Sequence, residues 1–320
     1  MLVRKRLRWQ RIVATSSGFL TYIVSWSTTI YVIHWFEERG AFGDSSLLGL
    51  FHIPFPLVGI LSTALAIFLA FRNNSAYDRW WEARKIWGGI VNISRTIGRQ
   101  VTAFAMLSER PEEERNAFAR EIVYRHIAWM NALRLQLRRE ESWEEIEPFV
   151  EKSEFDWLMQ RRNIATQLVQ KQGQRFSEAR QQGLITESRY HEMLDESLTV
   201  LYDLQGKAER IKNTPLPRQY DYFPRVFMFL FVTLLPSAMM TELMKVDTEW
   251  LVIPLTTAVS FMFYVLMRVG EFNEDPFERR HSDTPMTALC RTIEIDLREQ
   301  LGETSDSIPE KLEPVDGILM

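Results

Sequence analysis

The segment from Ile53 to Gly88 constrains the fold of this chain more than any other part of its sequence. It begins with an apolar run, IPFPLVGILSTALAIFLAF, and passes without a break into FRNNSAYDRWWEARKIWG. Residues 53–71 hold no ionisable side chain, and at ~1.5 Å per residue a helix of roughly 19 residues spans about 28 Å, close to a hydrocarbon core. The Arg and Trp residues that follow are typical of a membrane interface. We therefore expect a membrane helix that continues into a charged helix. The alternative, a buried helix of a large soluble protein, would normally carry a polar stripe.

Three further apolar runs are long enough, or nearly long enough, to span a membrane. They cover residues 12–36, 226–244 and 250–269. Ser and Thr residues dilute the first run, but their hydroxyl groups can bond back to a carbonyl one turn earlier and are tolerated among membrane helices. Together with residues 53–71, these runs predict four transmembrane helices.

The distribution of basic residues predicts the orientation of the spans. Lys and Arg are concentrated before the first span, after the second, before the third and after the fourth, whereas residues 37–52 contain one Arg and no Lys. Because cytoplasmic loops carry the excess of basic residues, we expect residues 37–52 to form an outer loop. This pattern predicts a multi-pass protein of the cell (inner) membrane with both termini in the cytoplasm.

The remaining sequence indicates a helical bundle on the cytosolic side. Residues 73–224 and 271–302 show no strict alternation of apolar and polar residues, so no sheet is expected. Residues 114–140 have the apolar periodicity of an amphipathic helix, carried by Phe118, Ile122, Ile127, Met130, Leu133 and Leu137. The predicted fold class is therefore all-α, with four transmembrane helices continuous with a large cytosolic bundle. Residues 1–302 are expected to form a single unit, and residues 303–320 a loosely ordered tail.

Capping patterns predict several helix ends in this bundle. Ser142 and Glu145 have the spacing of a capping box, and Thr284 followed by Pro285 fits an N-cap and first helical position. Gly183 is suited to ending a helix, because glycine readily adopts the left-handed conformation found there.

The sequence gives no sign of enzyme chemistry, of a cofactor or of a metal site. The 5 histidines have no ligand spacing, the single Cys290 has no partner and is expected to pack in a helix, and no phosphate loop or nucleophile motif is present. The acidic segments 112–115 and 140–147 are interpreted as solvated helix faces. A net charge of −4 lacks the basic surplus of a nucleic-acid-binding protein.

Three separated motifs carry a resemblance to a known family. They are FRNNSAYDRWWEARKIWG at 71–88, ERIKNTPLP at 209–217 and GEFNEDPFERRHSDTPMTALCRTIEIDL at 270–297. In this order around four spans, they make the chain resemble the bestrophins, specifically the prokaryotic bestrophin-like ion channels, over nearly its whole length. The resemblance implies structural or interface roles for Arg79, Trp80, Trp81, Glu82, Trp87, Pro215, Asp275, Pro276 and Phe277.

The resemblance also implies a homopentameric ion channel with one axial pore, whose neck is lined by the second span at Thr63, Ile67 and Phe71. Residues at i, i+4 and i+8 lie on one helix face, so five copies would form stacked rings. A narrow apolar ring can gate conduction by dewetting. Thr63 departs from the apolar pattern of the family, since a hydroxyl ring can hydrate an ion. Ile67 and Phe71 could instead pack between helices.

Independently of the family, four spans cannot easily enclose an ion path, whereas a ring of subunits creates one.

Two further expectations rest on the resemblance. A second constriction, the cytosolic aperture, is placed at Ile185. Calcium activation as in animal bestrophins is not expected, because Arg279 and Arg280 stand where carboxylate ligands would be needed. The acidic residues of this segment, Asp275, Glu278 and Asp283, are expected to pair with local cations and to hold the tail against the neighbouring subunit.

The resemblance favours a channel for small monovalent ions, with chloride and other anions as the first choice. The expected partners are the lipid bilayer, the permeant ions and other copies of the chain. A sodium- or potassium-selective bestrophin-like channel is the alternative, since the neck residues carry no charge. A non-conducting, membrane-anchored helical scaffold is the second alternative. A secondary transporter is disfavoured, because no span has a charge near its middle.

Overall fold

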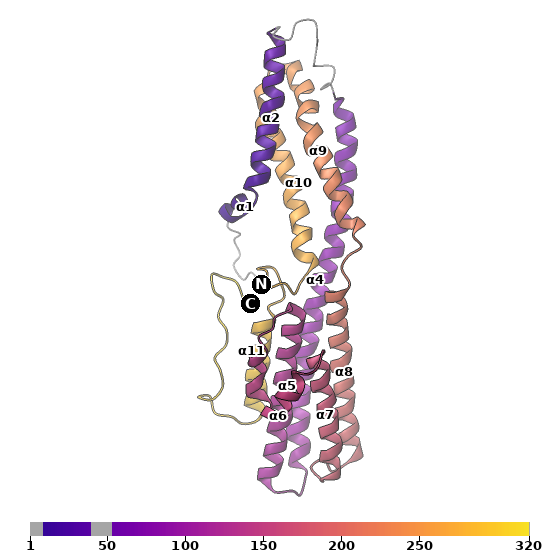
Figure 1. Ribbon diagram of the computed structural model, residues 1–320, viewed down its shortest axis with the longest axis vertical. Helices are drawn as coiled ribbons and strands as arrows, with labels where there is room; N and C mark the ends of the chain where they lie inside the picture. Colours follow the sequence, from indigo (N-terminus) through magenta and orange to yellow (C-terminus); the bar gives the residue numbers. More distant parts are fainter. Residues whose placement is uncertain (1–8, 40–52, 320) are drawn as a thin grey trace. The chain divides into compact units, whose positions relative to one another are not determined.

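The computed structural model describes residues 9–39 and 53–319, and its regular elements within these ranges are all helices (Figure 1). The sole β feature in the described part is an isolated bridge between Val315 and Ile318. The prediction of an all-α chain is thus confirmed for these residues. The expected outer loop at 37–52 lies mostly outside them.

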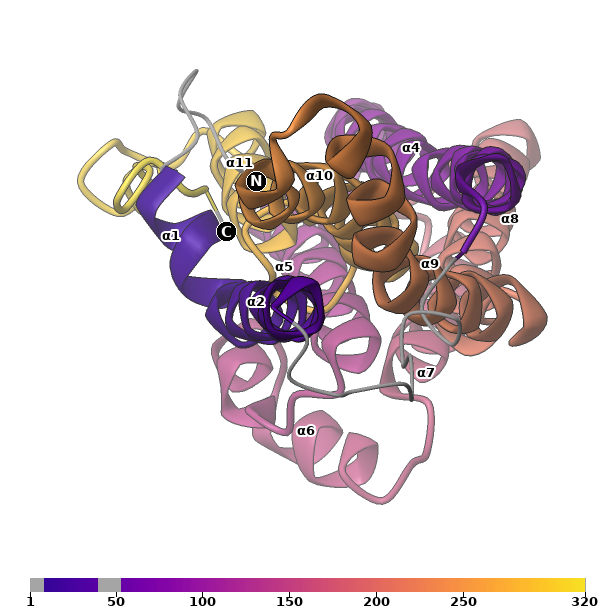
Figure 2. The same ribbon diagram turned by 90° about the horizontal axis from the view of Figure 1, so that it is seen from above.

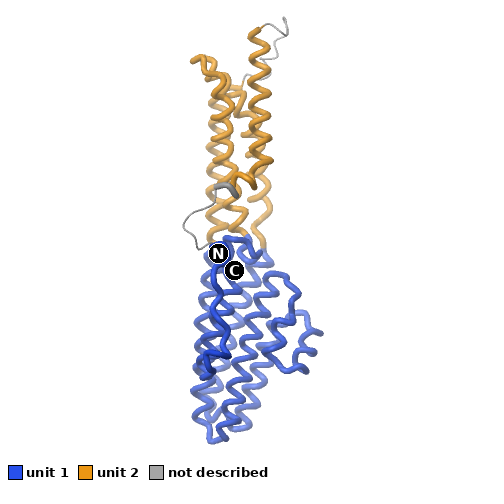
Figure 3. Tube along the Cα trace, turned by 90° about the vertical axis from the view of Figure 1, so that its left-hand side faces the viewer, with its two compact units in different colours: residues 1–4, 79–214, 275–320 blue, residues 5–78, 215–274 orange. Residues whose placement is uncertain are grey.

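The described residues form two compact units (Figure 3). Unit 2 contains the described residues up to 78 and residues 215–274, and unit 1 contains residues 79–214 and 275–319. The expectation that residues 1–302 act as one channel unit stays a prediction.

Unit 2 is built from long apolar helices. Its elements are α1 (Trp9–Thr15), α2 (Ser17–Glu38), the first part of α4 (Phe55–Met106), α9 (Gln219–Leu243), η2 (Met244–Val246), η3 (Glu249–Leu251) and α10 (Val252–Glu274). Helices α2, α9 and α10 pack side by side (Figures 1 and 2). Their contacts bury apolar side chains such as Ile23, Phe231 and Phe263.

Several hydroxyl groups in unit 2 donate to carbonyls of their own helix. The Ser27 hydroxyl donates to the Ile23 carbonyl at 2.7 Å, and the Thr256 hydroxyl donates to the Val252 carbonyl at 2.5 Å. The two hydroxyl oxygens lie 2.7 Å apart across the contact between α2 and α10, so either hydroxyl can donate its single proton to the other in place of its own carbonyl. The prediction that hydroxyls of the first span bond to carbonyls one turn earlier is confirmed at Ser27, Thr28 and Thr29.

Helix α4 confirms the central expectation from the sequence. It runs over 52 residues, from the apolar segment into the charged, Trp-rich segment. Residues up to 78 belong to unit 2 and the later ones to unit 1. Among the described residues, three helical segments are long and apolar enough to cross a membrane: Phe55–Met106, Gln219–Val246 and Glu249–Glu274. Helix α2 has 22 residues but is not among them, so the count of four spans stays a prediction.

Unit 1 is a bundle around a large apolar core. Its elements are the second part of α4, α5 (Glu112–Arg138), η1 (Trp143–Phe149), α6 (Lys152–Leu158), α7 (Ile164–Gln181), α8 (Ser188–Asn213) and α11 (Met286–Gln300). Helix α5 packs against η1, α7, α8 and α11. All six apolar residues that define its predicted buried face are buried, which confirms the amphipathic interpretation.

The helix ends of unit 1 follow the capping predictions only in part. Gly183 has a φ of 74° after α7, and the Leu184 amide donates to the Ala179 carbonyl at 2.9 Å, which is the Schellman arrangement. The Ser142 prediction is wrong, because its side chain makes no capping bond and the following element is the 3₁₀ helix η1. The Thr284 prediction is wrong as well: α11 begins at Met286.

Candidate functional site: the exposed face of α4 and the family motifs

The three expected neck residues lie on one exposed face of α4 within unit 2. Thr63 is exposed, and the side chains of Ile67 and Phe71 are 54% and 62% exposed. The same stretch of helix turns Leu65 and Leu69 into the core of unit 2. Because the helix has 3.6 residues per turn, the four-residue spacing keeps the exposed set on one side. This face is available to line a pore, to meet another copy of the chain or to face lipid.

Thr63 contributes an acceptor oxygen to this face. Its hydroxyl donates to the Gly59 carbonyl at 2.9 Å, so its proton is already engaged. The remaining lone pairs can accept a hydrogen bond from water or coordinate a cation, whereas an anion requires a donor. Discrimination in favour of anions therefore does not arise from this hydroxyl in the conformation observed.

A buried arginine follows the last residue of this face. The Arg72 side chain is only 1% exposed, and its Nη2 contacts a carboxylate oxygen of Asp221 and one of Glu274, the second at 3.3 Å. Its Nη1 donates to the Met267 carbonyl at 3.3 Å. The sequence analysis missed this contact. The available signal was the position of Asp221 near the start of one apolar helix and of Glu274 at the end of another.

The first family motif ties α4 to the end of α8 inside unit 1. The Arg79 guanidinium donates to the carbonyls of Ile211 and Thr214 at 2.7 and 2.6 Å. These carbonyls belong to the last turn of α8 and the residue after it, where acceptors lack intrahelical partners and a cation is favourable. Glu82 pairs with Arg210 at 2.6 Å.

The aromatic residues of that motif have different environments. The Trp80 indole donates to the Ser282 carbonyl at 2.8 Å. Trp87 is fully buried in the core of unit 1, whereas Trp81 is 46% exposed. Pro215, from the second motif, is exposed after the end of α8. Of the three tryptophans of the motif, Trp81 is thus the exposed one.

The middle of the third motif, residues 275–285, forms a non-helical link between α10 and α11. Pro276 and Phe277 are buried, and Asp275 is half-buried. The Pro276 carbonyl accepts from the Thr284 amide at 3.2 Å, which closes the link. The predicted helical region 271–302 therefore contains a non-helical segment, and the helix that follows it is α11.

The acidic residues of this link are engaged by nearby groups. Glu278 pairs with Lys212 and Arg279 pairs with Glu140, the latter at 3.1 Å. Asp283 accepts from the Arg280 amide at 2.9 Å, and burial raises the pKa of its carboxyl group to about 6. Pairing with local cations is thus observed for Glu278. In the part of the chain that the structure describes, no group of three or more His, Cys, Asp or Glu side chains is arranged to hold a metal ion.

Ile185, the expected aperture residue, is fully buried in the core of unit 1. A side chain that lines a pore must be exposed on its own subunit. The burial of Ile185 argues against this assignment, which stays a prediction. Cys290 is buried in α11 as expected, and burial raises the pKa of its thiol to about 12.

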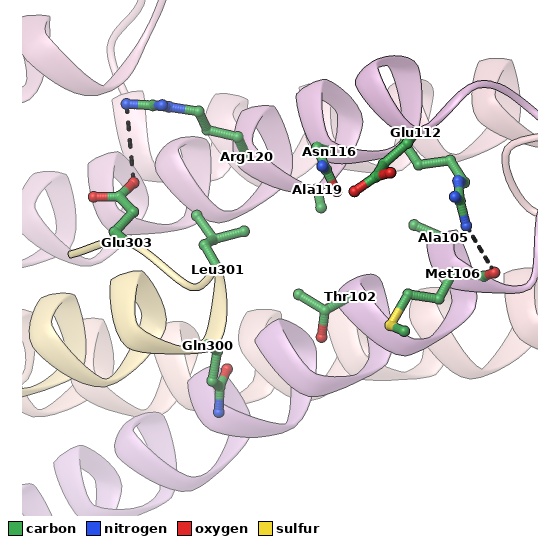
Figure 4. Close-up of a pocket in the computed structure, with 11 residues that line it drawn as sticks. Thr102, Ala105, Met106, Glu112, Asn116, Ala119, Arg120, Gln300, Leu301 and Glu303 are labelled. Atoms are coloured by element: carbon green, nitrogen blue, oxygen red, sulfur yellow. Dashed lines mark hydrogen bonds and ion pairs between the residues drawn. The ribbon is translucent and has the colours of Figure 1, made fainter.

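Unit 1 also contains a surface cavity of about 370 Å³, between the end of α4, the start of α5 and the segment after α11 (Figure 4). Glu112 and Glu303 line it together with Arg115 and Arg120, and Leu301 supplies apolar surface. The Arg115 Nη1 donates to the Met106 carbonyl at 2.9 Å, and Arg120 lies 3.9 Å from Glu303. Its two arginines and two glutamates balance, so the lining does not favour a ligand of either charge.

The apolar helices of unit 2 and the comparisons with known proteins identify the class of this protein as a helical membrane protein. The family model described as bacterial/fungal bestrophin protein matches residues 1–299, and the chain belongs to this family. The predicted resemblance is confirmed.

Named relatives and solved structures agree with this assignment. A voltage-dependent anion channel-forming protein of Mesorhizobium japonicum is 32% identical over 96% of this chain and 89% of its own length. A protein of the same description from Escherichia coli K12 is 28% identical over 98% of both chains. The crystal structure of a bacterial bestrophin homologue from Klebsiella pneumoniae has a TM-score of 0.78 and 25% identity, covering 89% of this chain and 98% of that one.

Proposed function

We propose that this chain is the subunit of a homopentameric anion channel, and not an enzyme. The relatives named as voltage-dependent anion channel-forming proteins support the choice of anions. In this proposal residues 1–302 act as one channel unit, with residues 303–320 as its tail. Helix α2 joins the three more apolar spans as a fourth, and both termini lie on the cytoplasmic side of the inner membrane.

The observation that carries the proposal is the exposed face formed by Thr63, Ile67 and Phe71. The described part of the subunit leaves more than half of the Ile67 and Phe71 surfaces uncovered, and a ring of subunits around an axis would bring five such faces together. The rings at Ile67 and Phe71 would form an apolar constriction that excludes water when narrow and admits ions when wider. The Thr63 ring would keep water at one end of this constriction.

The first test is the reversal potential of the purified protein in planar bilayers under a KCl gradient. An anion channel reverses near the chloride equilibrium potential. Reversal near the potassium potential would replace the proposal with a cation channel. Absence of current from pentamers of both the native protein and Phe71→Ala would favour the non-conducting scaffold.

A matched pair of variants tests the neck. Phe71→Ala should raise single-channel conductance, because it removes the bulk of an apolar ring. Phe229→Ala is the control, since Phe229 lies on α9 with an almost equal exposure, 61% against 62%. Its replacement should leave conductance unchanged. Equal effects of the two variants would overturn the assignment of the neck to α4.

A further inference from the structure

Unit 2 contains a connected cluster of six charged side chains, which we call the Arg72 cluster. It consists of Arg72, Asp221, Arg225, Arg268, Glu271 and Glu274. Arg225 joins the two halves, because it contacts Asp221 at 2.9 Å and Glu271 at 3.2 Å. Arg268 contacts Glu271 at 2.6 Å. The members come from the middle of α4, the start of α9 and the end of α10, so the charges gather at one end of the apolar helices.

The six described side chains of the cluster sum to zero charge, and Arg72 is the buried one. Three arginines face three carboxylates, and the Arg72 side chain is 1% exposed while that of Arg225 is 55% exposed. A buried cation is stable only when it is paired, and here it is paired with two carboxylates. Without Arg72, Asp221 would keep one cationic partner, and the cluster would carry one excess negative charge.

The cluster lies next to the last residue of the proposed neck. Arg72 follows Phe71 in the chain, and successive residues of a helix are rotated by about 100° around its axis. Phe71 is therefore exposed while Arg72 points into unit 2. Arg72 is next to the last neck residue in the chain, but its buried side chain lies off the exposed face. From this position the charges of the cluster act on a passing ion through their field and not by contact.

The close packing of α10 against α4 keeps this arrangement in place. The Asn73 side chain donates to the Leu266 carbonyl at 3.0 Å, and its Oδ1 occupies the space that a Cβ on Gly270 would need. A larger residue at Gly270 would displace the helix that carries Glu271 and Glu274. The carboxylates are thus held near Arg72 by backbone approach as well as by charge.

We propose that Arg72 is a selectivity-determining residue, which neutralises the carboxylates next to the neck and so prevents them from favouring cations. This inference rests on the proposed channel function. Arg72 does not touch the permeant ion. Its contribution is the charge balance of the cluster, and any change that makes the cluster negative should lower the preference for anions.

Three variants test the proposal, because it predicts the direction in which each one changes the anion-to-cation permeability ratio. The ratio is measured in a KCl gradient. Arg72→Gln leaves the cluster at −1 and should lower the ratio about fourfold or more. One unit charge in water at about 10 Å changes the occupancy of an ion about twofold, and it disfavours the anion while it favours the cation. Asp221→Asn leaves it at +1 and should raise the ratio. The double variant restores neutrality and should return the ratio to the native value.

A charge-matched control shows whether position matters. Lys245→Gln also removes one positive charge from unit 2, but Lys245 lies beyond the opposite end of α9, where it pairs with Glu242. The control should change the ratio much less than Arg72→Gln. An equal change would overturn the proposal, and so would a double variant that behaves like Arg72→Gln, since Arg72 would then act through packing alone.

The experiment also separates this inference from the proposed function. If the native protein does not conduct anions, the proposed function fails. If the native protein conducts anions and both single variants keep its permeability ratio, the inference about Arg72 fails alone. Should Arg72→Gln not yield pentamers, Asp221→Asn carries the test, because its opposite shift is required by the same argument.

Discussion

Helix α4 places the same kinds of side chain in opposite environments in the two units. In unit 2 its apolar residues Ile60 and Phe71 are 68% and 62% exposed, whereas in unit 1 Ile90 and Val101 are fully buried. In water, the unit 2 arrangement would leave a large apolar surface unburied. The contrast shows that unit 1 covers the apolar residues of α4 by itself, whereas unit 2 leaves them for surroundings outside the subunit, either lipid or other copies of the chain.

Both units engage buried polar groups in similar ways. Buried hydroxyls such as Ser27 in unit 2 and Ser94 in unit 1 donate to carbonyls of the same helix, and buried arginines such as Arg72 and Arg134 pair with carboxylates. Unit 1 buries single titratable groups whose pKa values are displaced by the loss of water, such as His126 and Asp283. The acid sensitivity of the folded protein should therefore come in part from these groups of unit 1.

The largest effect is expected from a matched pair of truncations on α4. Ile90→Ala should lower the free energy of unfolding by about 2 to 5 kcal/mol, because it opens a cavity in the core of unit 1. Ile60→Ala should change it by less than about 0.5 kcal/mol if lipid alone covers this position. Thermal or urea unfolding in detergent measures both. A cost at Ile60 comparable to that at Ile90 would show that protein, not lipid, covers this face.

A smaller effect is expected at His126, which is buried and bonded to the Ser94 hydroxyl at 2.8 Å. Burial lowers the pKa of its imidazole from 6.5 to about 3. The unfolded chain therefore binds more protons between these values, and His126 destabilises the fold as the pH falls below about 6.5. Relative to His126→Gln, the native protein should lose about 2 kcal/mol between pH 7 and pH 5. Equal pH profiles for the two proteins would show that the imidazole is not buried in its neutral form.

The smallest effect, with the opposite sign, is expected at Asp283. Burial raises the pKa of this carboxyl from 3.8 to about 6, so the folded chain binds the extra proton between these values. Its contribution to stability should increase as the pH falls through this window. Relative to Asp283→Asn, the native protein should gain about 1 kcal/mol between pH 7 and pH 5. A relative loss on acidification would indicate that the carboxylate is stabilised in its charged form.

The sequence predicts the elements with strong periodicity or apolar length. The 52-residue helix α4 and the buried face of α5 are expected from residue patterns alone, because each pattern extends over many turns. Helix caps predicted from only two residues are less reliable. Ser142 and Glu145 have capping-box spacing, yet Pro148 lies in the same short segment, which forms a 3₁₀ helix. Proline cannot donate a backbone hydrogen bond, so local patterns around it lose their usual meaning.

The sequence predicts the environment of some residues of the candidate site but not of others. Helical spacing predicts that Thr63, Ile67 and Phe71 share one helix face, and in the structure all three are exposed on one face of α4. The burial of Ile185 does not follow from its sequence, because an apolar residue after a helix-ending glycine suits a core as well as a surface. The partners of Arg72 could not be assigned either, because they depend on contacts between segments 149 and 202 residues apart.

The hydroxyl contact between Ser27 and Thr256 has a consequence for biosynthesis. These residues are 229 positions apart, and the segment between them includes residues 79–214 of unit 1. At a synthesis rate of about 5 to 20 residues per second, α2 leaves the ribosome roughly 10 to 50 seconds before its partner helix α10. During this interval α2 lacks its final neighbour. Most of unit 1 is therefore translated, and available to fold, before unit 2 can close.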